Sequence, residues 1–182
     1  MQDGARDDGD EKVSPFLIAL VAAVVLVLLA VLPRAGFDRH ALVGKPAPDF
    51  SLEVVHNGEP GAKMQLSSLK GHPVVLDFWA TWCGPCQVEA PILSRVAERY
   101  KDRGLVVVGV NTSDKPGLAS VFATKKQLRY PIVFDNDGEA GHAYAVESLP
   151  TLVIVGKDGT VRAVRSGIVD ENALDALVGA EL

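Results

Sequence analysis

The chain has 182 residues and a formal net charge of −5, from 18 lysine and arginine and 23 aspartate and glutamate side chains. After residue 32 there are 16 basic and 18 acidic side chains, a near balance without the basic footprint of a nucleic-acid-binding protein. We therefore expect no nucleic-acid partner, and the chain beyond that point is long enough for one ordinary domain.

The chain begins with a stretch, 1–15, that is rich in acidic residues and glycine. This composition predicts a disordered tail. Residues 16–32 follow without a polar side chain, and as a helix they would span about 25 Å, enough for a thin bilayer. We expect a single transmembrane anchor at 16–32 and a tether at 33–43.

Two other interpretations of the apolar run at 16–32 remain. A cleaved signal peptide would have a basic start, a shorter apolar stretch and a small-residue cleavage motif, and this chain departs from all three. A buried core helix would show one polar face, which this run lacks. Charge does not set the orientation of the anchor. Two basic residues lie near each end of the apolar run, so neither side has the excess of positive charge that marks the cytoplasmic side.

Residues 44–182 carry the pattern of an α/β domain. Apolar stretches bounded by turn motifs predict strands at 50–55, 64–66, 74–79, 105–110, 130–134, 151–155 and 161–166. Start and stop signals predict helices at 85–103, 114–128, 139–145 and 171–178. The first two strands would form an entry hairpin and the last two a closing hairpin. This order predicts a mixed sheet with helices on both faces.

The most informative motif, Trp82-Cys83-Gly84-Pro85-Cys86, joins the strand at 74–79 to the next helix, and its cysteines are the only two in the chain. In such a pair one thiolate attacks a substrate disulfide and the other thiol resolves the mixed disulfide. Cys83 would lie at the helix N-terminus, where free N–H groups and the helix dipole favour a thiolate. We expect Cys83 to be the exposed nucleophile and Cys86 the more buried resolving thiol.

A zinc site is the other common use of a Cys-x-x-Cys pair. A structural zinc ion needs four protein ligands, but the chain has no further cysteine, and its four histidines form no ligand-like pair. We therefore expect no metal. Thiol–disulfide exchange also needs no organic cofactor, so we expect none.

Asp77 is an acidic residue in an otherwise apolar strand. Burial should raise the pKa of its carboxyl group, and a buried acid with a perturbed pKa often marks a functional site. We expect Asp77 to accept the proton of Cys86 during resolution. The alternative is a structural acid that is paired with a neighbouring lysine.

Three segments give the chain a family resemblance. Residues 77–86, followed by Pro91, resemble the active-site segment of thioredoxin at the same spacing, and Leu149-Pro150-Thr151 resembles the cis-proline loop of that fold. Residues 44–50 and 66–71 resemble the entry of the redoxin, or AhpC/TSA-like, branch.

With the apolar run at 16–32, the chain is most similar to the TlpA/ResA-like family of membrane-anchored thiol–disulfide oxidoreductases. The resemblance implies a thioredoxin-like fold over 44–182, in which the helix and strand at 114–134 form the central insertion of this branch. The domain would face the periplasm or its equivalent.

The resemblance also implies roles for residues near the dithiol. Glu89 matches an active-site glutamate that influences thiol ionisation; the alternative is a solvated helix acid. Pro150 would follow a cis peptide bond and, with Thr151, form the loop that contacts the substrate and keeps metals off the dithiol. The remaining substrate-binding candidates are in the dithiol motif: Trp82, Gly84 and Pro85.

These features predict a membrane-anchored oxidoreductase that reduces protein disulfides outside the cytoplasm, including the haem-binding cysteines of apocytochrome c. In the family, a membrane thiol-electron transporter recharges the dithiol. Three alternatives remain: a disulfide-donating oxidase, a peroxiredoxin-like peroxidase and a non-enzymatic interaction domain of thioredoxin fold. The peroxidase pattern Pro-x-x-x-Thr-x-x-Cys is missing from the chain.

Overall fold

The computed structural model divides the chain into two compact units, residues 1–37 and 38–182. The residues that it describes are 14, 16, 18–24, 40–59 and 61–182. The second unit contains a seven-stranded sheet and the candidate active site.

In the first unit, residue 16 and residues 18–24 are helical. Over the part of the chain that is described, no helix is long and apolar enough to cross a membrane. Most of the predicted tail at 1–15, anchor at 16–32 and tether at 33–43 lies outside the described residues. These three segments therefore stay predictions.

The sheet of the second unit confirms the predicted α/β class. Its strands are β1 (Ser51–His56), β2 (Lys63–Gln65), β3 (Val74–Trp79), β4 (Val106–Thr112), β5 (Ile132–Asp135), β6 (Thr151–Val155) and β7 (Val161–Ser166). The helices are α2 (Gly84–Tyr100), α3 (Leu118–Lys126), α4 (Glu139–Ala143) and α5 (Glu171–Gly179), with the 3₁₀ turns η1 (Leu66–Leu69) and η2 (Lys101–Arg103).

The order of the strands, β2-β1-β5-β4-β3-β6-β7, places β3 well inside the sheet. β3 is parallel to β4 and antiparallel to β6, and β4 is parallel to β5. All residues of β3 are buried, because helices cover both faces of the sheet at this position, and this explains its nearly continuous apolar sequence. The predicted entry and closing hairpins are confirmed as the antiparallel pairs β1–β2 and β6–β7.

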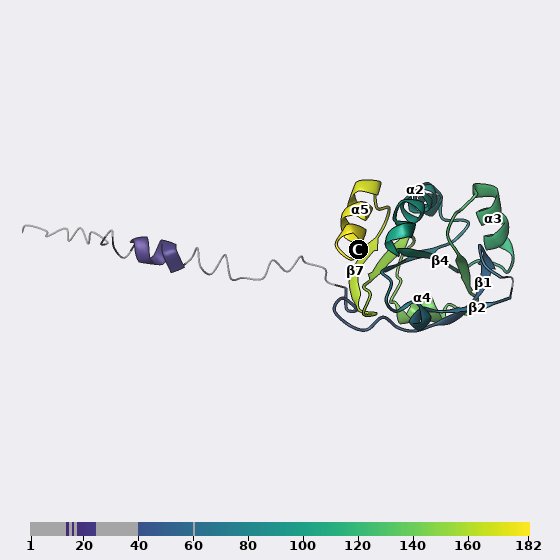
Figure 1. Ribbon diagram of the computed structural model, residues 1–182, viewed down its shortest axis with the longest axis horizontal. Helices are drawn as coiled ribbons and strands as arrows, with labels where there is room; N and C mark the ends of the chain where they lie inside the picture. The colour runs from purple at the N-terminus through teal and green to yellow at the C-terminus, as the bar shows by residue number, and fades with distance from the viewer. Residues whose placement is uncertain (1–13, 15, 17, 25–39, 60) are drawn as a thin grey trace, which may run out of the picture. The chain divides into compact units, whose positions relative to one another are not determined.

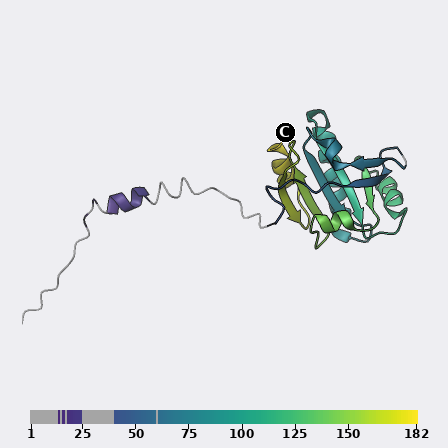
Figure 2. The ribbon, with the colours of Figure 1, turned by 90° about the horizontal axis from the view of Figure 1, so that it is seen from below.

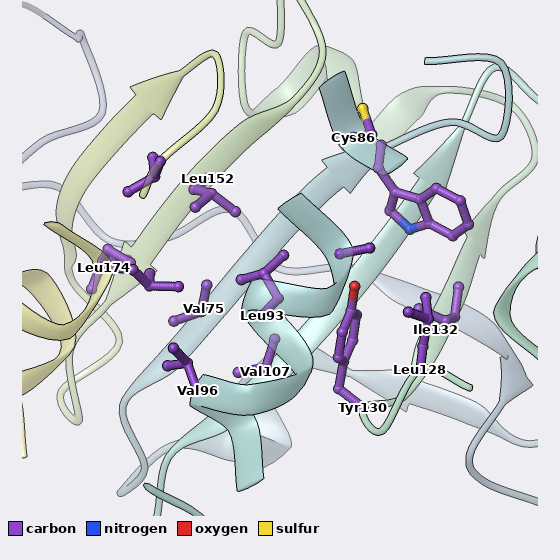
Figure 3. Packing of buried hydrophobic residues seen from close by; sticks show 14 of the residues in the cluster. Val75, Cys86, Leu93, Val96, Val107, Leu128, Tyr130, Ile132, Leu152 and Leu174 are labelled. Carbon is purple, nitrogen blue, oxygen red and sulfur yellow. The ribbon is translucent and has the colours of Figure 1, made fainter. Parts of the chain in front are cut away.

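Helices cover the two faces of the sheet unequally. α2, α3 and α5 lie on one face, and α4 with η1 lies on the other (Figure 1). Figure 2 shows the twist of the sheet in a second view. The face under α2 holds one apolar cluster, in which Leu93 and Val96 of α2 pack beside Val75 and Val107 of the sheet (Figure 3).

Alternate residues of β3 divide between the two faces, as the two-residue period of a strand requires. Val75 and Trp79 belong to the cluster under α2, whereas Leu76 and Phe78 belong to the opposite cluster. Asp77 lies two residues from both Val75 and Trp79, so its side chain points to the same face as theirs. That is the α2 face, below the helix that carries the dithiol.

The central helix and strand differ in their bounds from the expectation of 114–128 and 130–134. α3 begins at Leu118 and β5 at Ile132. The helix begins late because the carboxylate of Asp114 accepts hydrogen bonds from Thr81 instead of capping α3. Gly117, the residue before α3, adopts a φ of 83° that favours glycine. β5 pairs with β1 and β4 and so forms part of the central sheet.

Candidate active site

The dithiol motif lies where β3 ends and α2 begins. Cys83 is the N-cap residue of α2 in an extended conformation, and its Sγ accepts a hydrogen bond from the backbone N–H of Cys86 at 3.2 Å. Pro85 lies in the first turn, where its fixed φ suits a helix start and its missing N–H is not needed. The predicted position of Cys83 at the helix N-terminus is confirmed.

The two cysteines are joined by a disulfide, with Cα atoms 5.3 Å apart. Cys83 is 4% exposed and Cys86 is 3% exposed, so the expectation of an exposed Cys83 is wrong for this oxidised state. The reason is that the sulfurs are bonded to each other and both residues belong to the buried cluster under α2. A thiol that attacks this disulfide has only a narrow approach to either sulfur.

The surface next to the disulfide is largely apolar. Trp82 is 65% exposed, and Gly84 and Pro85 are also exposed, so these substrate-binding candidates lie at the surface. Val88, two residues after Cys86 in α2, adds a further exposed apolar side chain. This surface suits a protein substrate, because exposed apolar patches commonly mark interaction sites.

A groove runs beside Trp82. The residues that line it include Ser113, His142, Val146 and Leu149. It thus joins the dithiol motif to α4 and to the loop before Pro150. A separate pocket, lined in part by Asp49, Lys70 and Asp158, contains none of the predicted site residues.

The predicted cis peptide bond before Pro150 is confirmed. Thr151 pairs with Phe78 in the register of β6 and β3, which places this loop at the end of the sheet that carries the dithiol motif. Pro150 and Thr151 are buried. The Pro150 carbonyl accepts the N–H of Gly167 at 2.9 Å, and the Thr151 hydroxyl donates to the Ser148 carbonyl at 2.8 Å. Both residues therefore shape the loop from within.

Asp77 is buried at 3% exposure. Burial raises the pKa of its carboxyl group well above the usual range, and the nearby carboxyl of Glu89 raises it further. The Tyr130 hydroxyl lies close enough to lower this pKa in part, although the two groups do not form a well-aligned hydrogen bond. No lysine acts on Asp77, so the alternative of a lysine-paired structural acid is not met.

Glu89 is fully buried, so the alternative of a solvated helix acid is wrong. Its Oε1 accepts the backbone N–H of Val169 at 2.7 Å, which ties α2 to the segment between β7 and α5. Burial raises the pKa of Glu89 to about 7, and the hydrogen bond from Val169 offsets part of that rise. Two buried acids thus lie on the α2 face with elevated pKa values.

The loop before Cys83 is held by residues that follow β4. The Asp114 carboxylate accepts both the backbone N–H and the hydroxyl of Thr81, each at 2.7 Å. Asn111 donates to the same carboxylate at 2.7 Å, and the Trp82 indole N–H donates to the Ser113 carbonyl at 3.3 Å. We call this set of contacts the Asp114 clasp. It fixes the residues that lead into the nucleophile.

Sequence reasoning missed two residues near the dithiol, Asp114 and Tyr130. Asp114 carried a usable signal, because it closely follows a buried strand parallel to β3, and the carboxyl ends of parallel strands meet at one edge of a sheet. Tyr130 carried none, since its proximity to Asp77 depends on the tertiary packing of a distant segment.

In the described part of the chain, no group of three or more histidine, cysteine, aspartate or glutamate side chains is arranged to hold a metal ion. The described side chains of the site are a dithiol at a helix N-terminus and two buried acids of raised pKa.

Comparison with known proteins agrees with this geometry. Residues 43–164 match the AhpC/TSA family. The chain is 31% identical over 166 residues to the thiol-disulfide oxidoreductase ResA of Oceanobacillus iheyensis, which covers 91% of this chain and 84% of that protein. It is 34% identical over 131 residues to ResA of Bacillus subtilis, which covers 72% of this chain and 71% of that protein.

A solved structure supports the same assignment. A secreted Mycobacterium tuberculosis disulfide oxidoreductase, homologous to E. coli DsbE, aligns with a TM-score of 0.63 and 30% identity. The alignment covers 72% of this chain and 95% of that chain, so the thioredoxin-like fold extends over the domain. The chain therefore belongs to the AhpC/TSA family and, within it, to the ResA-type thiol–disulfide oxidoreductases.

Proposed function

We propose that this oxidoreductase works as a reductase of protein disulfides on the outer side of the cell membrane. The observation that carries the proposal is the dithiol pair Cys83–Cys86 at the N-terminus of α2, with the buried acid Asp77 on the strand that leads to it. The helix N-terminus favours a Cys83 thiolate, and a buried acid can take a proton near neutral pH.

The reaction has two steps. In the first, the Cys83 thiolate attacks one sulfur of the substrate disulfide, and the other substrate sulfur leaves as a thiolate that takes a proton from water. In the second, Cys86 loses its proton and attacks the Sγ of Cys83. The second substrate sulfur then leaves as a thiolate, and the Cys83–Cys86 disulfide forms. The substrate gains two electrons and the enzyme loses two.

Asp77 is the proposed acceptor of the Cys86 proton. Its buried carboxyl has no cationic partner that would hold it ionised, so protonation at neutral pH is accessible. Glu89, with a pKa of about 7, is the second proposed acid, and its charge raises the pKa of Asp77.

Substrate binding is proposed at the surface around the dithiol. Trp82, Gly84 and Pro85 are exposed there, and the groove beside Trp82 continues to Leu149, next to Pro150. An extended segment of a protein substrate would lie across this surface, with its cysteine at Cys83. The buried Pro150 and Thr151 would hold the loop in place.

The location and the partners follow from the sequence and the family resemblance. The apolar run at 16–32 supports a single-pass membrane anchor, and we propose that the domain faces the periplasm or its equivalent. A membrane thiol-electron transporter would return two electrons to the disulfide. The haem-binding cysteines of apocytochrome c are the proposed physiological substrate.

A peroxidase is the second candidate, because the matching family model is that of the AhpC/TSA proteins. Relatives at 31% and 34% identity are named as thiol-disulfide oxidoreductases instead. Consumption of hydrogen peroxide at a rate comparable to that of dithiol exchange would favour the peroxidase.

The proposal is tested with the reduced full chain and oxidised insulin, whose reduction is followed by precipitation of the free chains. Wild-type protein should accelerate the reaction well above dithiothreitol alone. Cys83→Ser should be inactive, whereas Cys86→Ser should accumulate a mixed disulfide between Cys83 and the substrate, because the resolving thiol is absent.

The location is tested separately with a membrane-impermeant maleimide on intact cells that carry the full chain. Labelling of the reduced dithiol would support an outward-facing domain, and protection until the cells are lysed would contradict it.

The insulin experiment tests the reductase activity itself. A wild-type protein that does not accelerate insulin reduction would contradict that activity.

A further inference from the structure

The neighbours of Asp77 in the sheet supply no charge. In the register of the sheet, Asp77 lies beside Gly109 of β4 and Leu152 of β6. Paired residues of adjacent strands point to the same face, so the positions that could present a cation to this carboxyl hold a glycine and a leucine. The partner of Asp77 must come from elsewhere in the fold.

Gly109 leaves room for that partner. A Cβ atom at position 109 would lie 2.5 Å from Cδ1 of Ile132, 3.0 Å from Nε1 of Trp79 and 3.1 Å from Cε2 of Tyr130. The first contact is too short for any Cβ atom, so a larger residue would displace Ile132, and Trp79 and Tyr130 would have to give by a few tenths of an ångström. The Tyr130 ring therefore packs closely against Gly109, beside Asp77.

Tyr130 brings a free donor into this space. It is 1% exposed, and its hydroxyl points toward the end of α2 that carries Cys86 (Figure 3). Its oxygen and Oδ1 of Asp77 are both buried, and neither has a hydrogen-bond partner among the described residues. Buried polar groups are rarely left unpaired, and those that are commonly belong to functional sites.

The groups that face Asp77 come from two further elements. α2 contributes the carboxyl of Glu89, which raises the pKa of Asp77, and the segment before β5 contributes the Tyr130 hydroxyl, which lowers it. Cys86 and Tyr130 belong to the same buried cluster. Of the two polar groups that act on Asp77, the hydroxyl is the one that favours the ionised carboxylate.

We propose that Tyr130 is a positioning residue for thiol exchange: when Asp77 ionises in the reduced protein, the Tyr130 hydroxyl turns to donate a hydrogen bond to its carboxylate and holds it ready to take the Cys86 proton. The inference rests on the proposed role of Asp77. In the step, the proton moves from the Cys86 sulfur to Asp77, and Tyr130 keeps its own proton throughout. Gly109 lets the Tyr130 ring pack closely beside Asp77.

The test is a titration of Asp77 in the reduced full chain with ¹³C-labelled aspartate, in which Asp77→Asn identifies the signal. Tyr130→Phe removes one oxygen and keeps the ring, so the packing beside Gly109 is retained. Loss of the hydroxyl donor should raise the pH at the midpoint of the Asp77 titration by about one unit. Insulin reduction below the midpoint should slow by about tenfold.

Tyr144→Phe is the matched control. Tyr144 is also buried, but its hydroxyl donates to the Pro48 carbonyl at 2.8 Å on the other face of the sheet. This variant should leave the Asp77 midpoint unchanged. An unchanged midpoint in Tyr130→Phe, or an equal shift in Tyr144→Phe, overturns the inference. The titration does not depend on activity, so failure of the reductase proposal would appear separately, as a wild-type protein that does not reduce insulin.

Discussion

The two faces of the central sheet treat their buried polar groups differently. On the face under α4, the Tyr144 hydroxyl donates to the backbone at Pro48. The Asp135 carboxylate accepts the N–H groups of Ala140 and Gly141 at 3.1 and 2.9 Å. Each of these groups is paired, as buried polar groups usually are, and each fixes a loop or a helix end.

On the face under α2, the matching groups lack partners. Oδ1 of Asp77, Oε2 of Glu89 and the Tyr130 hydroxyl are buried without a hydrogen bond to any described residue. An unpaired buried group costs about 1–3 kcal/mol, so this face gives up stability that the other face keeps. The difference indicates that the polar groups near the dithiol serve its chemistry, whereas those under α4 serve the fold.

The largest expected effect is a loss of activity at Asp77 that the other buried aspartate, Asp135, should not show. Asp77→Asn should slow insulin reduction by about 100-fold at neutral pH, because it removes the proton acceptor, while stability is retained. Asp135→Asn should cost about 1–3 kcal/mol of stability, because an amide nitrogen would face backbone donors, while activity is retained. Stopped-flow rates and urea unfolding measure the two quantities. Equal effects of the two variants on activity would remove the contrast between the faces.

Glu89 should make stability depend on pH. Its pKa is about 7 in the folded protein, raised from 4.5, so the folded state binds this proton more tightly than the unfolded state. The resulting stabilisation is complete below the unfolded pKa and is lost as the pH rises through about 7. The loss is about 3 kcal/mol, and the raised pKa of Asp77 acts in the same direction.

Urea unfolding of the oxidised protein across this pH range measures the effect of Glu89. Glu89→Gln cannot ionise, so its stability should fall less than that of the wild type as the pH rises. Glu98→Gln, an exposed acid on the same helix, is the control and should follow the wild type. Parallel curves for wild type and Glu89→Gln would show that Glu89 titrates as an ordinary acid.

A variant of the Asp114 clasp tests whether contacts that lie outside the two faces of the sheet affect activity. Asp114→Asn places an amide nitrogen among three donors, from Thr81 and Asn111, so the loop before Cys83 should loosen. We expect kcat/KM for insulin to fall by about tenfold, with increased acrylamide quenching of Trp82. Asp158→Asn, at the surface hairpin, is the control. Unchanged kcat/KM and quenching would restrict the clasp to a structural role.

The smallest expected effect is at the surface. Trp82→Phe keeps an aromatic ring beside the disulfide but loses the hydrogen bond to Ser113. KM for insulin should rise about two- to threefold, with kcat unchanged, because one exposed hydrogen bond contributes little. Steady-state kinetics measure both constants. A fall in kcat instead would place the indole in the chemical step.

The sequence predicted the fold and the dithiol because both depend on local pattern. The buried strand at 74–79, the helix start at Cys83 and the closing hairpin each follow from residues close together in the chain. The start of α3 was predicted too early, because Asp114 is used by a tertiary contact with Thr81 that no local signal records.

The electrostatics of the site could be predicted only in part. The raised pKa of Asp77 followed from one acid in an apolar strand, but the lysine offered as its alternative partner does not act on it. Tyr130 packs beside this acid against Gly109, a tertiary contact between distant segments that the sequence does not record. Likewise, the burial of Cys83 depends on the formed disulfide and the cluster under α2, which are properties of the folded, oxidised protein.

The reduction potential of the Cys83–Cys86 pair tests the central claim most directly. The full chain is equilibrated in dithiothreitol or glutathione buffers of known potential, and the reduced fraction is counted by thiol alkylation. A reductase of protein disulfides should have a potential near that of thioredoxin, about −270 mV. A value near that of DsbA, about −120 mV, would make the protein a disulfide donor and contradict the proposed direction of electron flow.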